Sequence, residues 1–432
     1  MGTRTISPGG SINGQVELPG DKSISHRYAL ISALAEGTSE ISNYSSAADC
    51  QSTLACLQDL GVKVHKADGI VRISGNGLEG LQEPRRVLDA QNSGSTMRML
   101  AGVLAGQRFT TTITGDDSLR GRPMRRIIDP LREMGAEIHS SEGDRAPLRI
   151  RGGKLRAIDY TPPVPSAQVK SAILLAGLYA DGITAVRESV CTRDHTELAL
   201  REFGADVECS RSIVRIHPRP KLAARQLAVP SDLSTAIFLI GVALVLPGSS
   251  LMLHNVGLNP TRARVLDFLV SRGAAIQVPA LQSRDGELAG SVSVTHSPLE
   301  GGTISGAQVA EMIDELPMLA ALGPYTEKGI EIHDAKELRV KESDRIAALS
   351  EGLRQMGAQV EEFPDGLRVE GRSAGKLRGA KVDPHGDHRI AMALAVAALG
   401  AKGDTMIRDA ECVAVSFPEF FTTVERLRER EK

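Results

Sequence analysis

The sequence predicts an α/β fold built from six copies of one helix–strand unit, arranged as two domains of three units each. Two observations lead to this prediction. Apolar helical segments rich in alanine and leucine recur six times, each followed by a glycine turn and a short β-branched segment. An amphipathic helix recurs between them and ends each time on the pattern Leu-x-x-x-Gly. Two elements that recur in the same order indicate a repeat rather than a chance richness in alanine and leucine.

The apolar segments set the period of the repeat. Each has a helical run that is apolar on all sides and is therefore expected to be buried, followed by residues that favour a strand. They span residues 28–41, 97–113, 171–186, 234–253, 316–332 and 390–407. The turn glycines are Gly37, Gly106, Gly182, Gly248, Gly329 and Gly403, so that one unit has roughly 70 residues.

The second helix of the unit has one apolar face. Its five clear copies end at Leu57–Gly61, Leu131–Gly135, Leu200–Gly204, Leu269–Gly273 and Leu353–Gly357. In one copy the apolar residues fall on a single helical face, namely Met124, Ile127, Ile128, Leu131 and Met134. We expect the closing glycine to take the left-handed conformation that ends many helices. Strands follow, for example over 62–64 and 70–73.

The length of the chain supports two domains. Its 432 residues exceed what one hydrophobic core usually serves. Six helices that are apolar all round must each be covered on every side, which a thin solenoid cannot do. Three units around a shared helical core, formed twice, would bury all six.

Composition excludes several classes of protein. The formal net charge is −2 and aromatic residues make up 3%, so neither a basic surface for nucleic acid nor a stacking platform for bases is expected. The five cysteines show no CxxC spacing, which favours reduced thiols in the cytoplasm. The start of the chain has no apolar signal segment, and the most apolar stretch, residues 236–246, is too short to span a bilayer. We expect no membrane partner.

Polar segments with helix-capping residues precede all six apolar helices. They are residues 20–27, 91–98, 165–171, 230–235, 313–317 and 386–390. Such caps are usually structural. Basic residues beside them are unusual because the helix dipole favours an acidic side chain there. They are Lys22, Arg27, Arg98, Lys170 and Arg389. A bound anion would relieve this conflict, because helix N-termini bind anions.

Two further basic clusters lie in expected loops, at residues 115–126 and 337–345. The first contains Arg120, Arg122, Arg125 and Arg126, and the second contains Arg339, Lys341 and Arg345. Each cluster alone could be a solvated surface. Together with the helix starts, they predict an enzyme whose substrates are small phosphorylated anions.

Seven separated segments resemble one family in the right order. They read GDKSISHRYAL (20–30), NSGSTMR (92–98), GDDSLRGRPM (115–124), SAQVKSAILLAGL (166–178), RDHTE (193–197), LRVKESDR (338–345) and GDHRIAMALAVAAL (386–399). The resemblance is to the 5-enolpyruvylshikimate-3-phosphate synthase (3-phosphoshikimate 1-carboxyvinyltransferase) family and covers nearly the whole chain. It implies a two-domain inside-out α/β barrel of six βαβαββ repeats. The implied domains are residues 20–229 and residues 1–19 plus 230–432, with the active site in the cleft between them.

The resemblance also implies the reaction. Members of the family transfer the enolpyruvyl group of phosphoenolpyruvate to the 5-hydroxyl of shikimate 3-phosphate and release phosphate, in the shikimate pathway of aromatic amino-acid biosynthesis. The reaction uses neither a metal nor another cofactor. We expect a monomer whose partners are these two small substrates.

Binding roles follow from the resemblance, residue by residue. Those for shikimate 3-phosphate are Lys22, Ser23, Arg27, Ser166, Ala167, Gln168, Arg193, Asp314 and Lys341. Those for phosphoenolpyruvate are Lys22, Gly94, Arg122, Gln168, Arg345 and Arg389. Paired arginines suit its carboxylate and phosphate because the guanidinium group binds both through two parallel hydrogen bonds. A glycine at 94 suits close approach of the backbone.

The catalytic roles are a hypothesis built on the same resemblance. Addition of the hydroxyl and elimination of phosphate require a base and an acid. We assign Asp314 as the base and Glu342 as the proton donor, while Lys22 and Lys341 stabilise charge or share in proton transfer. A purely structural alternative for Asp314 is a helix N-cap, and both roles are compatible. We interpret His26, His195 and His388 as supporting residues.

Alternative functions have recognisable signatures. A UDP-N-acetylglucosamine enolpyruvyl transferase shares the architecture but typically has Lys-Asn in the first loop, where this chain has Lys22-Ser23, and a cysteine in the loop at 115–122, where this chain has none. An RNA phosphate cyclase needs a nucleotide site. A non-catalytic ligand-binding relative would lack one of the catalytic residues. One departure from many relatives is Val415, where they have lysine.

Overall fold

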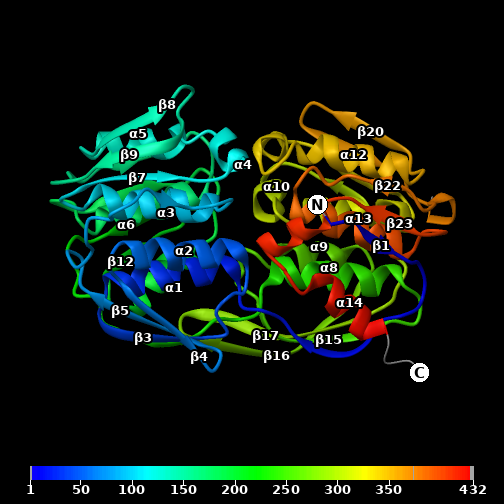
Figure 1. The fold of residues 1–432 in the computed structure, drawn as a ribbon. Helices are drawn as coiled ribbons and strands as arrows, with labels where there is room; N and C mark the ends of the chain where they lie inside the picture. Colours follow the sequence, from blue (N-terminus) through cyan, green and yellow to red (C-terminus); the bar gives the residue numbers. More distant parts are fainter. Residues whose placement is uncertain (1, 373, 429–432) are drawn as a thin grey trace. The chain divides into compact units, whose positions relative to one another are not determined.

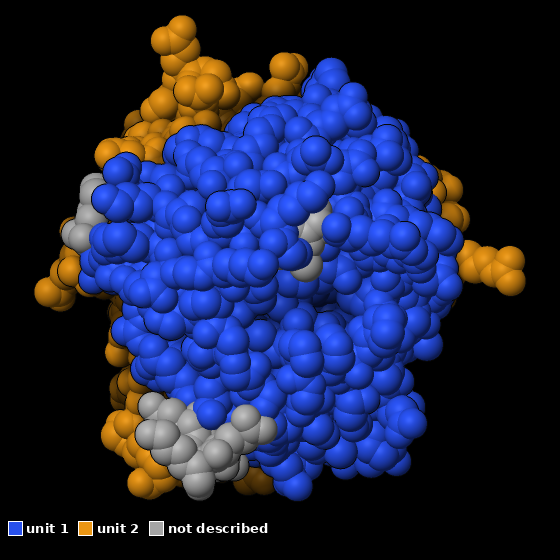
Figure 2. Space-filling model, turned by 90° about the vertical axis from the view of Figure 1, so that its right-hand side faces the viewer, with its two compact units in different colours: residues 1–19, 231–282, 288–432 blue, residues 20–230, 283–287 orange. Residues whose placement is uncertain are grey.

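The computed structural model describes residues 2–372 and 374–428. The chain divides into two compact units, which are coloured separately in Figure 2. Unit 1 consists of residues 1–19, 231–282 and 288–432, and unit 2 of residues 20–230 and 283–287.

Unit 2 contains three repeats, which can be followed in Figure 1 from blue to green. The first has α1 (Lys22–Leu34), β3 (Glu36–Ser42), α2 (Ala48–Asp59), β4 (Lys63–Ala67) and β5 (Ile70–Asn76). The second has β6 (Leu88–Asp89), α3 (Gly94–Ala105), β7 (Thr110–Thr114), α4 (Asp117–Gly121), α5 (Arg125–Glu133), β8 (Glu137–Ser141) and β9 (Arg145–Arg151). The third has β10 (Asp159–Tyr160), α6 (Ala167–Gly177), β11 (Thr184–Arg187), α7 (His195–Glu202), β12 (Val207–Cys209) and β13 (Ile213–Ile216), and β14 (Gln226–Ala228) follows.

Unit 1 contains the other three repeats. Its fourth-repeat elements are β2 (Asn13–Glu17), α8 (Leu233–Val245), β15 (Ser250–Gly257), α9 (Arg264–Ser271), β16 (Ala275–Arg284) and β17 (Glu287–Thr295). The fifth repeat has β18 (Gly302–Ile304), α10 (Ala307–Met312), α11 (Leu316–Leu322), η1 (Gly323–Tyr325), β19 (Ile330–Ile332), η2 (Lys336–Val340), α12 (Arg345–Gln355), β20 (Val360–Phe363) and β21 (Gly366–Val369). The sixth has η3 (Ala374–Lys376), β22 (Lys381–Val382), α13 (His388–Leu399), β23 (Thr405–Ile407), η4 (Ala410–Val415) and α14 (Phe420–Arg428), with β1 (Arg4–Ile6) added from the start of the chain.

Each repeat is centred on one small sheet, and the four-stranded sheets share one strand order. In the second repeat β6 pairs in parallel with β7, β7 pairs antiparallel with β9, and β9 pairs antiparallel with β8. Five sheets have four strands, and the sheet β1–β23–β22 has three. This arrangement confirms the predicted α/β fold of six βαβαββ repeats.

Two strands are exchanged between repeats. Strand β2 directly precedes α1 in the sequence, yet it pairs in parallel with β15 of unit 1. Strand β14 directly precedes α8, yet it pairs in parallel with β3 of unit 2. Unit 2 therefore completes one sheet with a strand from a distant part of the chain, and unit 1 completes two, because β1 also pairs with β23.

The apolar helices form the two cores, as predicted. In unit 2 the helices α1, α3 and α6 are packed together, and in unit 1 the helices α8, α11 and α13 are packed together. Every residue of α8 and of α13 is buried. The predicted apolar face of α5 is also buried, through Met124, Ile127, Ile128, Leu131 and Met134.

The five Leu-x-x-x-Gly motifs end their helices as expected. All five glycines have a positive φ, which residues with a Cβ rarely adopt. The angles are 83° at Gly61, 107° at Gly135, 99° at Gly204, 96° at Gly273 and 92° at Gly357.

The tip of the hairpin formed by β16 and β17 belongs to unit 2. The domain division predicted from the sequence, with boundaries at 19/20 and 229/230, did not include this feature. Asp285 accepts a hydrogen bond from the backbone N–H of Ala228 through its carboxylate and another from the Tyr28 hydroxyl through its carbonyl. Glu287 Oε1 lies 2.7 Å from His195 Nδ1. Strand periodicity indicates a hairpin but not where its tip is packed.

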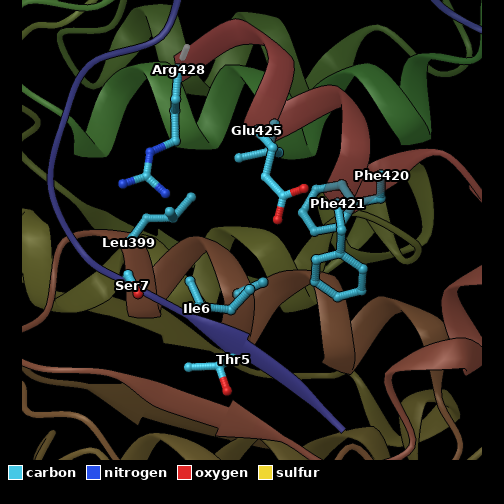
Figure 3. Close-up of a pocket in the computed structure, with 10 residues that line it drawn as sticks. Thr5, Ile6, Ser7, Leu399, Phe420, Phe421, Glu425 and Arg428 are labelled. Atoms are coloured by element: carbon cyan, nitrogen blue, oxygen red, sulfur yellow. The ribbon is translucent and has the colours of Figure 1, made fainter. Parts of the chain in front are cut away.

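None of the helices in the described ranges is long and apolar enough to cross a membrane. Unit 1 has a cavity of about 150 Å³ that is lined by residues including Ile6 of β1, Leu399 of α13, and Phe420 and Phe421 of α14. Figure 3 shows these side chains. The cavity contains none of the candidate site residues.

Candidate functional site

The acidic residue predicted as the base, Asp314, lies among three cations of unit 1. Its Oδ1 atom is 3.9 Å from Lys341 Nζ and 3.7 Å from Arg345 Nη1, and its Oδ2 atom is 3.8 Å from Arg389 Nη2. Arg389 also donates a hydrogen bond to the carbonyl oxygen of Asp314 at 2.6 Å. The structure thus brings together four of the predicted residues, which come from three separate segments.

Arg345 is the most enclosed member of this group. Its Nη2 atom donates to Glu342 Oε2 at 2.7 Å, and its Nε atom donates to Asp387 Oδ2 at 2.8 Å. Burial alone would lower the pKa of Arg345, but the neighbouring carboxylates outweigh it and the pKa is raised. Arg345 therefore remains charged and is held in one orientation.

Lys341 has the opposite electrostatic environment. Burial lowers the pKa of its ammonium group, Asp314 opposes this effect, and the positive charge of Arg345 adds to it. A lysine with a lowered pKa gives up its proton more readily, which suits a role in charge stabilisation or proton transfer.

Charges in this cluster balance in the absence of an anion. Three cations, Lys341, Arg345 and Arg389, face three carboxylates, which are those of Asp314, Glu342 and Asp387.

The alternative role for Asp314 as a helix cap is wrong. Helix α11 begins at Leu316, the N-cap position is Glu315, and no side chain makes a cap hydrogen bond there. The motif contains two adjacent acidic residues, and the sequence alone did not indicate which one precedes the first helical turn.

In unit 2 the predicted residues gather at the starts of three core helices. Lys22 is the first residue of α1, and its Nζ atom lies 2.9 Å from Asp49 Oδ2 on α2. The cap of α1 is Asp21, which accepts from the N–H of Ile24, so the basic residue follows a working N-cap as expected.

Arg27 crosses from α1 to two other helices. Its Nε atom donates to Thr196 Oγ1 at 2.6 Å, and its Nη2 atom donates to Ser171 Oγ at 2.9 Å. Its Nη1 atom donates to the carbonyl of Ser23 at 2.8 Å. Burial lowers the pKa of Arg27 to about 10. The hydroxyls of α6 and α7 thus fix a charged group that is almost completely buried.

The start of α6 is organised by hydrogen bonds from both sides. Ser166 is its N-cap and accepts from the N–H of Val169, and Ala167 follows as the first helical residue. Gln168 accepts a hydrogen bond from Arg98 and donates one to Ser95 Oγ at 2.8 Å. The three residues predicted to hold the acceptor therefore form a fixed turn.

Gly94 begins α3 beside two arginines. A Cβ atom at this position would lie 3.1 Å from Arg98 Nη1 and 3.4 Å from Arg122 Nη1. Arg122 itself donates to Asn92 Oδ1 at 2.7 Å. A side chain at position 94 would therefore contact the guanidinium groups of Arg98 and Arg122, and the proposed close approach of a ligand to the backbone of Gly94 stays a prediction.

Two of the three motif histidines have clear supporting contacts. His26 Nδ1 lies 2.7 Å from Thr53 Oγ1 in the core of unit 2. Burial lowers the pKa of His26 well below 6.5, and the charges of Lys22 and Arg27 add to this effect. His195 lies beside Glu287 in the hairpin tip.

Sequence reasoning missed three residues that support the predicted ones. Asp387 was expected only to cap α13, and it does so by accepting from the N–H of Arg389, but it also binds Arg345. Asp49 pairs with Lys22, and Arg98 binds Gln168. The sequence did contain an indication of Arg98, because it is a basic residue at a helix start. No sequence feature indicated Asp49.

The described residues contain no group of three or more histidine, cysteine or acidic side chains that could hold a metal ion.

Comparisons with known proteins agree with the geometry. The profile of the family described as EPSP synthase (3-phosphoshikimate 1-carboxyvinyltransferase) matches residues 6–424. The 3-phosphoshikimate 1-carboxyvinyltransferase of Solibacter usitatus is 55% identical, covering 99% of this chain and 100% of the relative, and that of Koribacter versatilis is 53% identical, covering 98% and 99%. The solved EPSP synthase of Acinetobacter baumannii has a TM-score of 0.87 at 39% identity and covers 99% of this chain and 98% of its own. The chain therefore belongs to the EPSP synthase (3-phosphoshikimate 1-carboxyvinyltransferase) family.

Proposed function

We propose that this protein transfers the enolpyruvyl group of phosphoenolpyruvate to the 5-hydroxyl of shikimate 3-phosphate and releases phosphate. The observation that carries the proposal is the position of Asp314 among Lys341, Arg345 and Arg389. A carboxylate that can take a proton lies there beside groups that can bind an anion. Relatives named 3-phosphoshikimate 1-carboxyvinyltransferase match almost the whole chain, which favours this acceptor over a nucleotide sugar.

We assign the phosphate and the carboxylate of the acceptor, shikimate 3-phosphate, to residues of unit 2. Arg27, Arg193 and the turn at Ser166–Gln168 supply cations and hydrogen-bond donors for these groups, and Ser23 and Lys22 complete the set. Lys341 and Asp314 of unit 1 serve the ring hydroxyls. Two phosphates, at about −1.5 to −2 each, and two carboxylates need several cations as a complement.

The donor is assigned to Arg345, Arg389, Arg122, Lys22, Gln168 and the space beside Gly94. Arg345 and Arg389 both lie within 4.0 Å of Asp314. When phosphoenolpyruvate binds to these arginines, their positive charges stabilise the Asp314 carboxylate less strongly. Its basicity then rises at the moment when a base is needed. Binding of the donor thus prepares the base.

Proton transfers follow from the same charge balance. Asp314 accepts the proton of the 5-hydroxyl while the hydroxyl oxygen attacks C2 of phosphoenolpyruvate. Glu342, in its protonated form, delivers a proton to the methylene carbon. In the second step the Glu342 carboxylate takes a proton back from the new methyl group, the C–O bond breaks so that phosphate leaves with its electron pair, and the C=C double bond forms again. Lys22 and Lys341 stabilise the charge that develops. The placement of this chemistry between the two domains remains a prediction.

The decisive experiment measures phosphate release from phosphoenolpyruvate by the purified full chain. We expect release that depends on shikimate 3-phosphate. UDP-N-acetylglucosamine as the acceptor and a reaction without acceptor serve as controls. Release at equal rates with and without an acceptor, or release only with the nucleotide sugar, would contradict the proposal. The absence of release, with both ligands still bound, would indicate a non-catalytic relative.

A further inference from the structure

A buried ion cluster of unit 2 lies behind the residues assigned to the acceptor. Lys170 of α6 contacts two carboxylates, with its Nζ atom 2.9 Å from Glu188 Oε2 and 2.7 Å from Glu197 Oε1. The side chains of Lys170 and Glu197 are exposed by only 2% and 1%, and that of Glu188 by 10%. We call Lys170, Glu188 and Glu197 the ion triad.

The ion triad holds the residue next to Arg193. Thr192 donates its backbone N–H to Glu188 Oε1 at 3.0 Å and also donates its hydroxyl to the same carboxylate oxygen. The carbonyl of Thr192 accepts a hydrogen bond from Lys170 Nζ at 3.3 Å. Three hydrogen bonds to buried charged groups fix this point of the loop, so that Arg193 starts from a fixed backbone position.

The same cluster connects α6 to α7 at the place where Arg27 inserts. Ser171 and Thr196 contact each other through their hydroxyls at 2.6 Å, and both accept from Arg27. Lys170 directly precedes Ser171, and Glu197 directly follows Thr196. The Lys170–Glu197 ion pair therefore holds together the two helices that position Arg27. Ser171 also donates to the carbonyl of Ala167 at 2.6 Å, which joins the network to the start of α6.

The charges of the ion triad also act on the two nearby arginines, Arg27 and Arg193. Arg193 acts to lower the pKa of Arg27 and Glu197 acts to raise it, so the two arginines repel each other while Glu197 opposes that repulsion. Burial raises the pKa of Glu197 even though Lys170 is beside it. The triad contains two carboxylates and one ammonium group, and this excess of acidic groups favours two nearby cations.

We propose that Lys170, Glu188 and Glu197 are positioning residues for the acceptor's phosphate. They fix Arg193 through Thr192, hold Arg27 through the α6–α7 contact, and supply negative charge that allows both arginines to lie close together before the ligand binds. This inference rests on the proposed function, because it assigns the ligand of Arg27 and Arg193 as shikimate 3-phosphate.

The test replaces Lys170 by methionine, which has a similar length and no charge. We expect the dissociation constant of shikimate 3-phosphate, measured by calorimetry on the purified full chain, to rise by about 10- to 100-fold. KM for this substrate should rise in parallel, while KM for phosphoenolpyruvate and kcat should change by less than about threefold. Lys170→Arg keeps the charge and should restore part of the affinity.

A matched control separates positioning from general loss of stability. Leu175→Ala removes a buried side chain from the same helix, with 1% exposure and no part in the ion triad. It should lower the melting temperature and leave the affinity for shikimate 3-phosphate unchanged. Equal affinity in Lys170→Met and in the wild-type protein would overturn the proposal, as would an equal loss in Leu175→Ala.

A milder variant covers the case in which Lys170→Met does not fold. Thr192→Val keeps the shape of the side chain. It removes the hydrogen bond from the hydroxyl to Glu188 and leaves the one from the backbone N–H. We expect the affinity for shikimate 3-phosphate to fall by about threefold to tenfold, and an unchanged affinity would again overturn the proposal. If the wild-type protein binds no shikimate 3-phosphate, the proposed function itself fails. Binding to the wild-type protein is therefore measured before any variant is made.

Discussion

The Nε atom of Arg345 lies 2.8 Å from Oδ2 of Asp387, and neither side chain is exposed by more than 1%. Asp387 also caps α13 by accepting from the N–H of Arg389. One carboxylate thus orients two of the three arginines that we assign to phosphoenolpyruvate, Arg345 through its side chain and Arg389 through its backbone. This relationship makes the geometry of the two arginines interdependent.

Replacing Asp387 by asparagine tests that dependence. A buried guanidinium group would lose its partner's charge, so we expect the free energy of unfolding to fall by about 3 kcal/mol and KM for phosphoenolpyruvate to rise by about tenfold. Denaturant unfolding and steady-state kinetics measure the two effects. The control, Asp159→Asn, weakens the exposed pair with Arg187 and should leave the free energy of unfolding nearly unchanged. Equal losses in both variants would contradict the prediction.

Replacing Asp314 by alanine tests the assignment of the base. We expect kcat to fall by about 10²- to 10⁴-fold because a general base contributes on that order, while the dissociation constant of shikimate 3-phosphate stays within about threefold. Rapid-quench measurement of a single turnover checks that the chemical step is the one affected. Survival of turnover would show that another group takes the proton. Glu311→Ala, on nearby α10 and outside the assigned residues, is the matched control.

An alanine at position 94 tests the role of the missing side chain. Its Cβ atom would approach Arg98 Nη1 to 3.1 Å and Arg122 Nη1 to 3.4 Å, and only the flexible ends of these side chains would have to move. We expect an unchanged melting temperature and an increase of about 3- to 30-fold in KM for phosphoenolpyruvate, since displaced arginines bind its anionic groups less well. Gly121→Ala, where no atom lies within 4 Å of the new Cβ, should leave KM unchanged.

The pKa of His26 predicts a dependence of stability on pH. Its folded-state pKa is lowered well below 6.5, chiefly by burial, while the unfolded chain binds the proton near pH 6.5. Unfolding takes up a proton between these two values, so stability falls as the pH falls below about 6.5, by up to about 1.4 kcal/mol per pH unit. Urea unfolding from pH 8 to pH 5 measures this slope.

The variant His26→Asn keeps a polar group for Thr53 and has no titration in this range. We expect its stability to be lower at pH 8 and its dependence on pH to be flatter than that of the wild-type protein. His139→Asn, at an exposed position beside Glu137, should reproduce the wild-type slope. A slope that is the same in all three proteins would assign the effect to other groups.

Much of the fold was predictable because its causes are local. A helix that must be covered on all sides has a distinct composition, as at Ala236–Ile240, and a left-handed helix end selects glycine, as at Gly135. Strand exchange was not predictable. Nothing in residues 13–17 indicates a partner at 250–254 rather than at 36–42, because pairing depends on where distant segments lie.

For the candidate site, the sequence indicated the motif residues but not the residues that support them. Motifs indicated Lys341, Glu342 and Arg345, which the structure brings to Asp314 from another segment. Their roles remain predictions. Supporting residues such as Asp49 were hidden, because a single acidic residue on an amphipathic helix usually faces solvent. Only the tertiary fold reveals that its carboxylate lies next to Lys22.

The exchanged strands determine when each unit can be completed during synthesis. Strands β1 and β2 leave the ribosome first, yet β2 pairs with β15 at residues 250–254 and β1 pairs with β23 at residues 405–407. The first sheet of unit 2 likewise lacks β14 until residue 228 has been made. Contacts so distant in sequence form late and slow folding. The sheets that contain β2 and β1 are therefore completed only after residues 254 and 407 have been made, late in the synthesis of the chain.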